Sequence, residues 1–273
     1  MTGGPPIPFP SPMLLFGCGN MAGAMVQGWM AAGVPAASFH IVKPTDRNLP
    51  PGARYFSDAG QVPGKYETIL IGIKPQNLAA MADDIRALLS PGALVISILG
   101  GVATDSLMRH FPDARILRVM PNLAVALGKS PLGLFARGLD DADQRTAESW
   151  LAPLGTPYWL VQEADMHAFT ALAGCGPAYL YRFIDAMAQA AEQMGIEPVP
   201  AARLAKEMIE GAALLAARSS DTPGELAARV ASKGGSTAAG LAMLDRDEAL
   251  NNLIAVTLRA ARDRSIEQGK EAE

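Results

Sequence analysis

A short glycine-rich segment, Gly17 to Ala22, constrains the fold of this chain more than any other feature. It reads Gly-Cys-Gly-Asn-Met-Ala and directly follows an apolar run, Met13 to Phe16. The first glycine permits a tight turn, the second lets a pyrophosphate approach the backbone, and the alanine keeps a following helix close to the strand. Because unpaired amides at a helix N-terminus attract phosphate, the segment predicts a dinucleotide site. A plain structural turn is the alternative interpretation.

The first half of the chain alternates apolar, strand-like runs with segments of helical spacing. Each run is apolar on both faces, which is typical of a parallel sheet covered on both sides. We therefore predict an α/β fold with an N-terminal Rossmann-like, doubly wound sheet. The predicted strands are 13–16, 39–42, 68–73, 93–99 and 115–120, with possible short strands at 132–135 and 158–161, and the helices between them include 77–89 and 104–110.

The second half of the chain is predicted to be an all-helical C-terminal domain. From Asp165 onward there is no convincing strand, and long stretches are rich in Ala, Leu and Met. Helices of this kind bury little area each, so we expect the domain to complete its core with another subunit. The predicted helices are 178–194, 200–218, 223–231, 237–244 and 247–268. The predicted domains are a loose extension at 1–12, a dinucleotide-binding domain at 13–162 and the helical domain at 163–273.

Composition argues against several classes of protein. A formal net charge of −4 provides no basic field for nucleic acid or an anionic membrane. Two distant cysteines, Cys18 and Cys175, and three histidines indicate neither a disulfide framework nor a metal site. The first twelve residues lack the positive start of a secretory signal, and no apolar run approaches the roughly 18 residues of a membrane span. We expect a cytoplasmic protein without metal, nucleic acid or membrane partners.

The end of the second predicted strand indicates which dinucleotide would bind. An NAD site usually carries an Asp or Glu there to accept the ribose hydroxyls. This chain has Lys43 in that place, followed by Thr45 and Arg47. A cation and a hydroxyl suit a 2′-phosphate, so NADPH is favoured. The alternative is that Lys43 and Arg47 are ordinary surface cations and that Asp46 keeps NADH possible.

Three further strand ends are expected to border the crevice that would hold the dinucleotide. Ligands of an open α/β sheet lie in such a crevice, at the carboxyl ends of the strands. The third strand ends at Gly72 to Gln76, which places Lys74 at the mouth of this crevice. The fourth ends at Ser97 to Gly101, where two glycines leave room for a flat ring. The fifth is followed by Met120-Pro121-Asn122, which places an amide at the same rim. Together these strand ends favour a ligand-binding site, although each of them alone would more often be only the start of a loop.

The segment Ser232 to Thr237 is the candidate site of the helical half. Glycines precede Ser236 and Thr237, and a helix follows. Either hydroxyl can cap that helix, and the amides of Gly235, Ser236 and Thr237 form a nest suited to a carboxylate. An ordinary cap after a flexible turn is the alternative. For His167, in the same half, a structural role is favoured over catalysis.

With these motifs the chain resembles the pyrroline-5-carboxylate reductases, from about Met13 to Gln268. The most specific match is Ser232-Lys233-Gly234-Gly235-Ser236-Thr237, which resembles the family signature S-P-G-G-[TA]-T. The family runs G-S-G-P-A-Y, A-V-K-P and R-x-M-P-N resemble Ala173–Tyr179, Ile73–Pro75 and Arg118–Asn122, respectively.

The resemblance implies an activity and an assembly. The activity is NADPH-dependent reduction of 1-pyrroline-5-carboxylate to L-proline by hydride transfer to the C=N carbon, the last step of proline biosynthesis. The assembly is a homodimer or a homodecamer. Lys233 replaces the usual proline, which leaves open a reductase of a related cyclic imino acid. A non-catalytic NADP-binding protein of the same fold is the remaining alternative.

The resemblance also implies roles for individual residues. Thr237 would be the catalytic residue, with its hydroxyl hydrogen-bonded to the ring nitrogen of the substrate. Gly235, Ser236 and Thr237 would bind the substrate carboxylate, and Val230 would line the ring pocket. The residues expected to contact the cofactor are Phe16, Gly17, Cys18, Gly19, Asn20, Met21, Lys43, Thr45, Gly72, Ile73, Lys74, Pro75, Ser97, Ile98 and Leu99.

Overall fold

The computed structural model describes residues 9–47 and 49–271, and the chain divides into two compact units. The sheet unit comprises Met1–Gly174 together with Ala261–Glu273. The helical unit comprises Cys175–Ala260. The chain therefore leaves the sheet unit after Gly174 and returns to it with its last helix.

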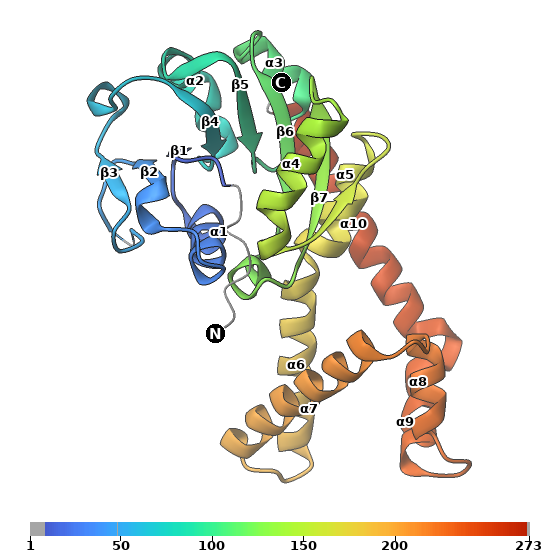
Figure 1. Cartoon of the computed structure of the whole chain (residues 1–273). Helices are drawn as coiled ribbons and strands as arrows, with labels where there is room; N and C mark the ends of the chain where they lie inside the picture. Colours follow the sequence, from blue (N-terminus) through green and yellow to red (C-terminus); the bar gives the residue numbers. More distant parts are fainter. Residues whose placement is uncertain (1–8, 48, 272–273) are drawn as a thin grey trace. The chain divides into compact units, whose positions relative to one another are not determined.

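The sheet unit is built on one eight-stranded sheet, shown in Figure 1. Its strand order is β3-β2-β1-β4-β5-β6-β7-β8, so the order reverses between β1 and β4. Such a reversal opens a crevice at the carboxyl ends of the two strands. The strands are β1 (Met13–Phe16), β2 (Phe39–Val42), β3 (Arg54–Phe56), β4 (Tyr66–Ile71), β5 (Leu89–Ser97), β6 (Arg115–Met120), β7 (Ser130–Arg137) and β8 (Gly155–Trp159).

The predicted doubly wound sheet is confirmed, but two of its details were wrong. β3 was missed because it has three residues, of which only Phe56 is buried. β7 pairs antiparallel with β6, whereas every other neighbouring pair is parallel. A parallel return needs a crossover of about a dozen residues or more. The β6–β7 connection is mostly one 3₁₀ turn, η4 (Leu123–Leu127), so the chain turns back directly.

The apolar runs are buried on both faces of the sheet because alternate side chains point to opposite sides. In β1, Met13 and Leu15 join one core cluster, and Leu14 and Phe16 join the other. The first cluster contains Trp29 and residues of α1 and α4, and the second contains residues of α2 and α3. These helices are α1 (Asn20–Ala31), α2 (Leu78–Ala87), α3 (Thr104–His110) and α4 (Asp141–Leu151).

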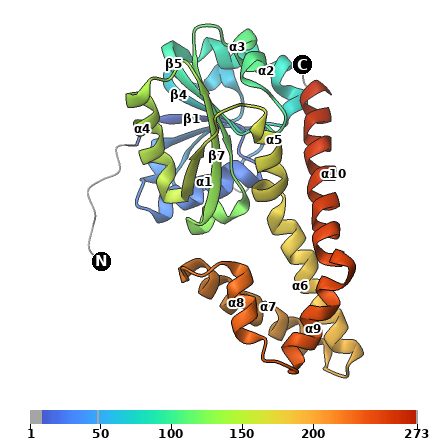
Figure 2. The same ribbon diagram turned by 90° about the vertical axis from the view of Figure 1, so that its right-hand side faces the viewer.

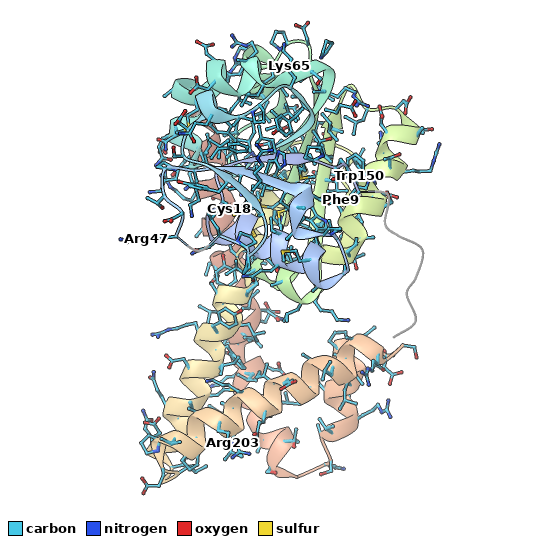
Figure 3. All side chains as sticks on the ribbon, turned by 60° about the vertical axis from the view of Figure 1, so that its left-hand side comes forward. Phe9, Cys18, Arg47, Lys65, Trp150 and Arg203 are labelled. Atoms are coloured by element: carbon cyan, nitrogen blue, oxygen red, sulfur yellow. The ribbon has the colours of Figure 1, made fainter. Side chains whose placement is uncertain are left out.

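Part of the predicted extension at 1–12 is packed against the sheet unit. The Phe9 ring lies 5.2 Å from the ring of Trp29 and 5.3 Å from that of Phe39, centroid to centroid. The Trp29 indole nitrogen donates a hydrogen bond to the carbonyl of Trp150, which is labelled with Phe9 in Figure 3. The expectation of a loose segment is therefore wrong at Phe9. Residues 1–8 of that segment lie outside the described residues.

The helical unit contains no strand in its described residues, as the sequence predicts. Its helices are α6 (Gly176–Gln193), α7 (Pro198–Arg218), α8 (Pro223–Val230), α9 (Ser236–Asp245) and the first part of α10 (Ala249–Glu271), all visible in Figure 2. Thr222 and Glu225 form a capping box that starts α8. Large apolar side chains are exposed along these helices, with Leu215 on α7 at 71%. None of the helices in the described ranges has the length and apolar character needed to cross a bilayer.

Candidate functional site

The turn from β1 to α1 crosses the end of β4 at very close range. The Gly17 amide donates to the Val42 carbonyl at 2.8 Å, and the Gly72 amide donates to the Phe16 carbonyl at 2.9 Å. Gly17 has φ +87°, and a Cβ there would lie 2.8 Å from the Gly72 carbonyl oxygen. A larger residue would therefore clash with backbone as well as adopt an unfavourable conformation.

Gly19 borders open space at the N-terminus of α1. A Cβ built at Gly19 would meet no atom of the described chain within 4 Å. Gly19 is the N-cap, no side chain caps the helix, and its first turn has no acidic residue. The first amides of a helix lack intrahelical partners, so they are available to an anion. Glycine at this position fits a closely approaching pyrophosphate.

Ala22 keeps α1 close to the end of β4. Its side chain is buried, and a Cβ added to Gly72 would lie 2.9 Å from the Ala22 Cβ. A bulkier residue at position 22 would push the helix away from the strand. The third position of the glycine motif is thus explained by packing.

Cys18, within the same motif, has a buried side chain (labelled in Figure 3). Burial raises the pKa of its thiol, and the positive charge of Lys43 offsets part of that rise. The thiol is therefore protonated at neutral pH, and it contributes packing rather than a nucleophile.

Lys43 lies between two hollows beside the glycine motif. Its Nζ donates to the Arg47 carbonyl at 2.6 Å, which closes the loop after β2, and its amide donates to Phe56 of β3 at 3.1 Å. One hollow, of about 870 Å³, is also lined by Gly19 and other residues of α1, and one of about 230 Å³ lies at the ends of β1, β2 and β4. Thr45 is exposed. Arg47 extends away from the rest of the unit in Figure 3.

The residues that follow β4 and end β5 differ in how deeply their side chains are buried. Leu99 is buried in the core and Ser97 is buried with its hydroxyl near the Leu99 amide, at 3.3 Å. Ile73 is half-buried and Lys74 is exposed. A hollow of about 370 Å³ is lined by Pro75, Gln76, Gly100, Gln268 and Glu271.

The amide of Asn122 does not face the crevice, and that expectation was wrong. The residue is buried. Its Oδ1 accepts from the Ala124 amide at 2.9 Å, so it caps η4, and its Nδ2 donates to the Ala173 carbonyl at 2.8 Å. Ala173 belongs to a π-helical turn, Thr170–Gly174. Asn122 therefore joins the β6–β7 connection to this turn.

A charged cluster that joins β6, the first residue of α3 and the segment after β8 was not expected from the sequence. Arg118 Nη1 donates to Glu163 Oε1 at 2.5 Å, and the amide and hydroxyl of Thr104 donate to the same carboxylate at 2.7 and 2.6 Å. Burial raises the pKa of Glu163, but the hydrogen bonds from Thr104 and Arg118 outweigh it, and the net pKa is lowered. A buried Arg requires a carboxylate partner. Because Arg118 and Glu163 are far apart in the sequence, the sequence alone does not indicate that Glu163 is this partner.

His167 takes part in a structural contact. It lies in α5 (Asp165–Phe169), and its Nδ1 is 2.9 Å from the Ser265 hydroxyl on α10. Burial lowers the pKa of His167, as does the charge of Arg118, while Glu163 opposes the shift. A neutral ring that fastens two helices agrees with the structural role favoured from the sequence.

The predicted substrate segment forms the turn between α8 and α9 in the helical unit. Val230 is the last residue of α8 and is exposed. The Gly235 amide already donates to the Ser232 carbonyl at 2.9 Å, and a Cβ at Gly235 would lie 2.5 Å from the Ser232 hydroxyl oxygen. The expected capping of α9 by Ser236 or Thr237 is wrong, because both lie inside the helix and Gly235 is the N-cap. Both residues are exposed at the start of α9.

Together, the sheet unit provides an anion-binding helix end at a switch point, and the helical unit provides a second helix N-terminus with two exposed hydroxyl residues. Among the described residues, no cluster of three or more His, Cys, Asp or Glu has the arrangement of a metal site. Each helix N-terminus, taken by itself, has backbone amides that are available to an anion.

Comparison with known proteins identifies two family models in the chain. Residues 163–268 match the model described as pyrroline-5-carboxylate reductase dimerisation. Residues 13–101 match the model described as NADP oxidoreductase, coenzyme F420-dependent. The first match covers most of the helices after Asp165, and the second covers the glycine motif and the strands up to β5.

Whole-chain relatives agree with these matches. A pyrroline-5-carboxylate reductase of Pasteurella multocida is 32% identical over 265 residues, which is 93% of this chain and 96% of the relative. A Pseudomonas aeruginosa relative of the same name is also 32% identical, over 94% of this chain and 97% of its own.

Solved structures give the same result. The reductase of Coxiella burnetii superimposes with a TM-score of 0.86 at 28% identity, over 95% of this chain and 99% of that one. The Plasmodium falciparum enzyme, solved with NADP bound, has a TM-score of 0.84 at 25% identity over 94% and 97% of the two chains. The chain is an oxidoreductase, and it belongs to the pyrroline-5-carboxylate reductase family.

Proposed function

We propose that this chain catalyses the NADPH-dependent reduction of 1-pyrroline-5-carboxylate to L-proline, with hydride transfer to the C=N carbon. The observation that carries the proposal is the 32% identity to curated reductases over 93% of the chain. The open backbone at Gly19 supports it, because that space fits a pyrophosphate at the N-terminus of α1.

The choice of NADPH over NADH rests on Lys43. An acidic residue at the end of β2 would favour ribose hydroxyls, and Lys43 stands there instead. Its Nζ lies at the loop carbonyl of Arg47, within the lining of both hollows beside the glycine motif. Thr45 is exposed nearby in sequence and adds a hydroxyl donor for the 2′-phosphate.

The remaining cofactor contacts are assigned by their places in the crevice. Phe16 to Met21 would surround the pyrophosphate, and Gly72 to Pro75 with Ser97 to Leu99 would flank the nicotinamide and its ribose. Because the Leu99 side chain is buried in the core, it would contribute through its backbone. When bound, the reduced nicotinamide supplies the hydride.

Substrate binding is assigned to the turn before α9. The amides of Ser236 and Thr237 begin a helix, so they would hold the substrate carboxylate. Gly235 would shape the turn, since its amide is engaged with Ser232. Val230 would line the ring pocket, and the Thr237 hydroxyl would hydrogen-bond the ring nitrogen. A protonated imine is already electrophilic, so these residues would act mainly by positioning.

The chain would act as a homodimer, with the homodecamer as a larger assembly of dimers, in the cytoplasm. The support is the dimerisation model over residues 163–268 and the exposed apolar side chains of the helical unit. Exposed apolar surface on this scale favours a protein partner. Light scattering that finds a stable monomer would contradict the dimer.

An NADPH-oxidation assay tests the proposal. The purified chain is given 1-pyrroline-5-carboxylate, or its six-membered ring homologue, with NADPH or NADH. We expect the five-membered substrate and NADPH to give the highest kcat/KM. Preference for the six-membered ring would assign the related imino acid that Lys233 suggests. Dinucleotide binding without any imine-dependent oxidation would show a non-catalytic protein and overturn the proposal.

A further inference from the structure

Glu163 connects three elements of the sheet unit at one carboxylate. It follows β8, its partner Arg118 lies on β6, and Thr104 is the first residue of α3. The Arg118 and Glu163 side chains are only 5% and 19% exposed. Two charges withdrawn from water remain favourable only where further hydrogen bonds hold their geometry, and here both donors of Thr104 do so. The cluster therefore fixes Thr104 relative to β6.

Thr104 directly follows the β5–α3 turn, residues 98–103, and α10 packs against the same turn at Gly101. Gly101 has φ +81°, and a Cβ on it would lie 3.0 Å from the backbone nitrogen of Gly269. A Cβ on Gly269 would lie 3.1 Å from the Gly101 carbonyl oxygen. Ser265, one turn earlier on α10, is anchored by His167. The turn is thus held at Gly101 by a helix and at Thr104 by a carboxylate.

The β5–α3 turn borders the place proposed for the nicotinamide. Ile98 and Leu99 begin it, and Gly100 lines a hollow together with Pro75 and Gln268. A flat ring placed there takes its position from the path of this backbone. A displacement of about 1 Å at a reacting centre can lower a rate by about 100-fold. Groups that fix the turn therefore affect the reaction without touching the reactants.

We infer that Glu163 is a positioning residue of the reduction: by holding both donors of Thr104 it fixes the β5–α3 turn in the shape that receives the nicotinamide. The inference rests on the proposed function. Glu163 acts through Thr104, and Arg118 keeps its carboxylate in place.

The test compares Glu163→Gln with the matched control Asp143→Asn. Asp143 also pairs with an arginine of β6, Arg115, but at the first residue of that strand. Three quantities are measured: hydrogen exchange of the amides at 98–107 without cofactor, the Kd for NADPH, and kcat and KM for 1-pyrroline-5-carboxylate. We expect Glu163→Gln to speed that exchange, raise the Kd several-fold and lower kcat about tenfold, with KM for the imine little changed. The control should leave all three near the wild-type values.

The outcomes separate positioning from a merely structural role. If Glu163→Gln lowers the melting temperature but leaves exchange in the turn, the NADPH Kd and kcat within about twofold of wild type, the inference is overturned. If Glu163→Gln does not fold, Thr104→Val and Thr104→Ser test the same inference, because only Thr104→Ser keeps the hydroxyl donor. Thr104→Val should reproduce the faster exchange and lower kcat, and Thr104→Ser should restore them. Failure of the wild-type chain to reduce the imine would reject the proposed function. Hydrogen exchange in the turn and the Kd for NADPH would still test whether Glu163 positions the turn.

Discussion

Gly101 and Gly269 meet backbone to backbone in the sheet unit. A Cβ on either residue would lie 3.0–3.1 Å from backbone atoms of the other. Gly101 follows β5, whereas Gly269 lies near the end of α10, which re-enters the sheet unit from the helical unit. The C-terminal turn of α10 is therefore part of the wall beside the candidate nicotinamide site, and Gln268 and Glu271 line the hollow there.

Gly101→Ala should destabilise the sheet unit. The new Cβ would meet the α10 backbone, and φ +81° is unfavourable for alanine, so we expect a loss of about 1–3 kcal/mol in the free energy of unfolding. Gly100→Ala is the control, because a Cβ there meets nothing within 4 Å in the described chain. Urea unfolding measures both variants. Equal stability of the two would contradict the close contact between Gly101 and α10.

Replacement of Gly17 and of Gly19 by alanine should affect different properties, the first stability and the second cofactor binding. Gly17→Ala places a Cβ 2.8 Å from the Gly72 carbonyl oxygen at φ +87°, so it should lower the unfolding free energy without any ligand by about 1–3 kcal/mol. Gly19→Ala meets no protein atom within 4 Å, so it should leave that stability nearly unchanged. It should instead raise the NADPH Kd at least about tenfold, because the methyl group occupies the space proposed for the pyrophosphate. Calorimetry and fluorescence titration separate the two effects.

Thr237→Ala should lower kcat/KM for 1-pyrroline-5-carboxylate by more than about tenfold, or roughly 1.4 kcal/mol. The hydroxyl proposed to hydrogen-bond the ring nitrogen is lost, while the residue is exposed in α9, so stability should change little. Thr237→Ser keeps the hydroxyl and should retain most of the activity. Unchanged kinetics in Thr237→Ala would remove its assigned role.

Much of the architecture follows from local sequence signals. β1, β2, β6 and α3 begin and end at the predicted residues, because each apolar run or helical stretch is bounded by Gly, Pro or a change of periodicity. The helices after Asp165 lie within a few residues of their predicted ranges for the same reason. The glycine motif also specifies its own geometry, since each small residue has a steric cause in the structure.

What the sequence did not reveal depends on contacts between distant residues. β3 is stabilised by pairing with β2 rather than by its own three residues. The side-chain amide of Asn122 was expected at the rim of the ligand site, yet it forms hydrogen bonds with the backbone of Ala124 and Ala173. The Glu163 carboxylate meets Arg118 and Thr104 only in the folded chain. No local periodicity records which distant partner a polar side chain will find.

The Glu163 carboxylate should make stability depend on pH in a definite direction. Its pKa in the folded chain is lowered, because the hydrogen bonds from Thr104 and Arg118 outweigh burial, whereas unfolding returns it to its ordinary value of 4.5. The stabilisation is therefore present above pH 4.5 and lost as the pH falls through the lower, folded pKa. The groups that face it are Arg118, Thr104 and His167.

This dependence is measured as the difference in unfolding free energy between wild type and Glu163→Gln. The difference should be large at pH 7 and shrink as the pH is lowered below 4.5, since other titrating groups are common to both proteins. Urea titrations at several pH values provide it. A difference that stays constant with pH would show that the charge of Glu163 does not contribute.

Lys43→Met should reduce the preference for NADPH over NADH. A charge-assisted hydrogen bond to a phosphate contributes about 1.5–3 kcal/mol, so the KM for NADPH should rise about ten- to a hundredfold. Lys43 also closes its loop through the Arg47 carbonyl, and loss of that bond would affect both cofactors alike. The KM for NADH should therefore stay near its original value if the phosphate contact is what Lys43 provides. Arg47→Met is the control, because Arg47 extends away from the unit and the same charge is removed (Figure 3). An equal rise in both KM values in Lys43→Met would assign the residue to loop closure rather than to cofactor choice.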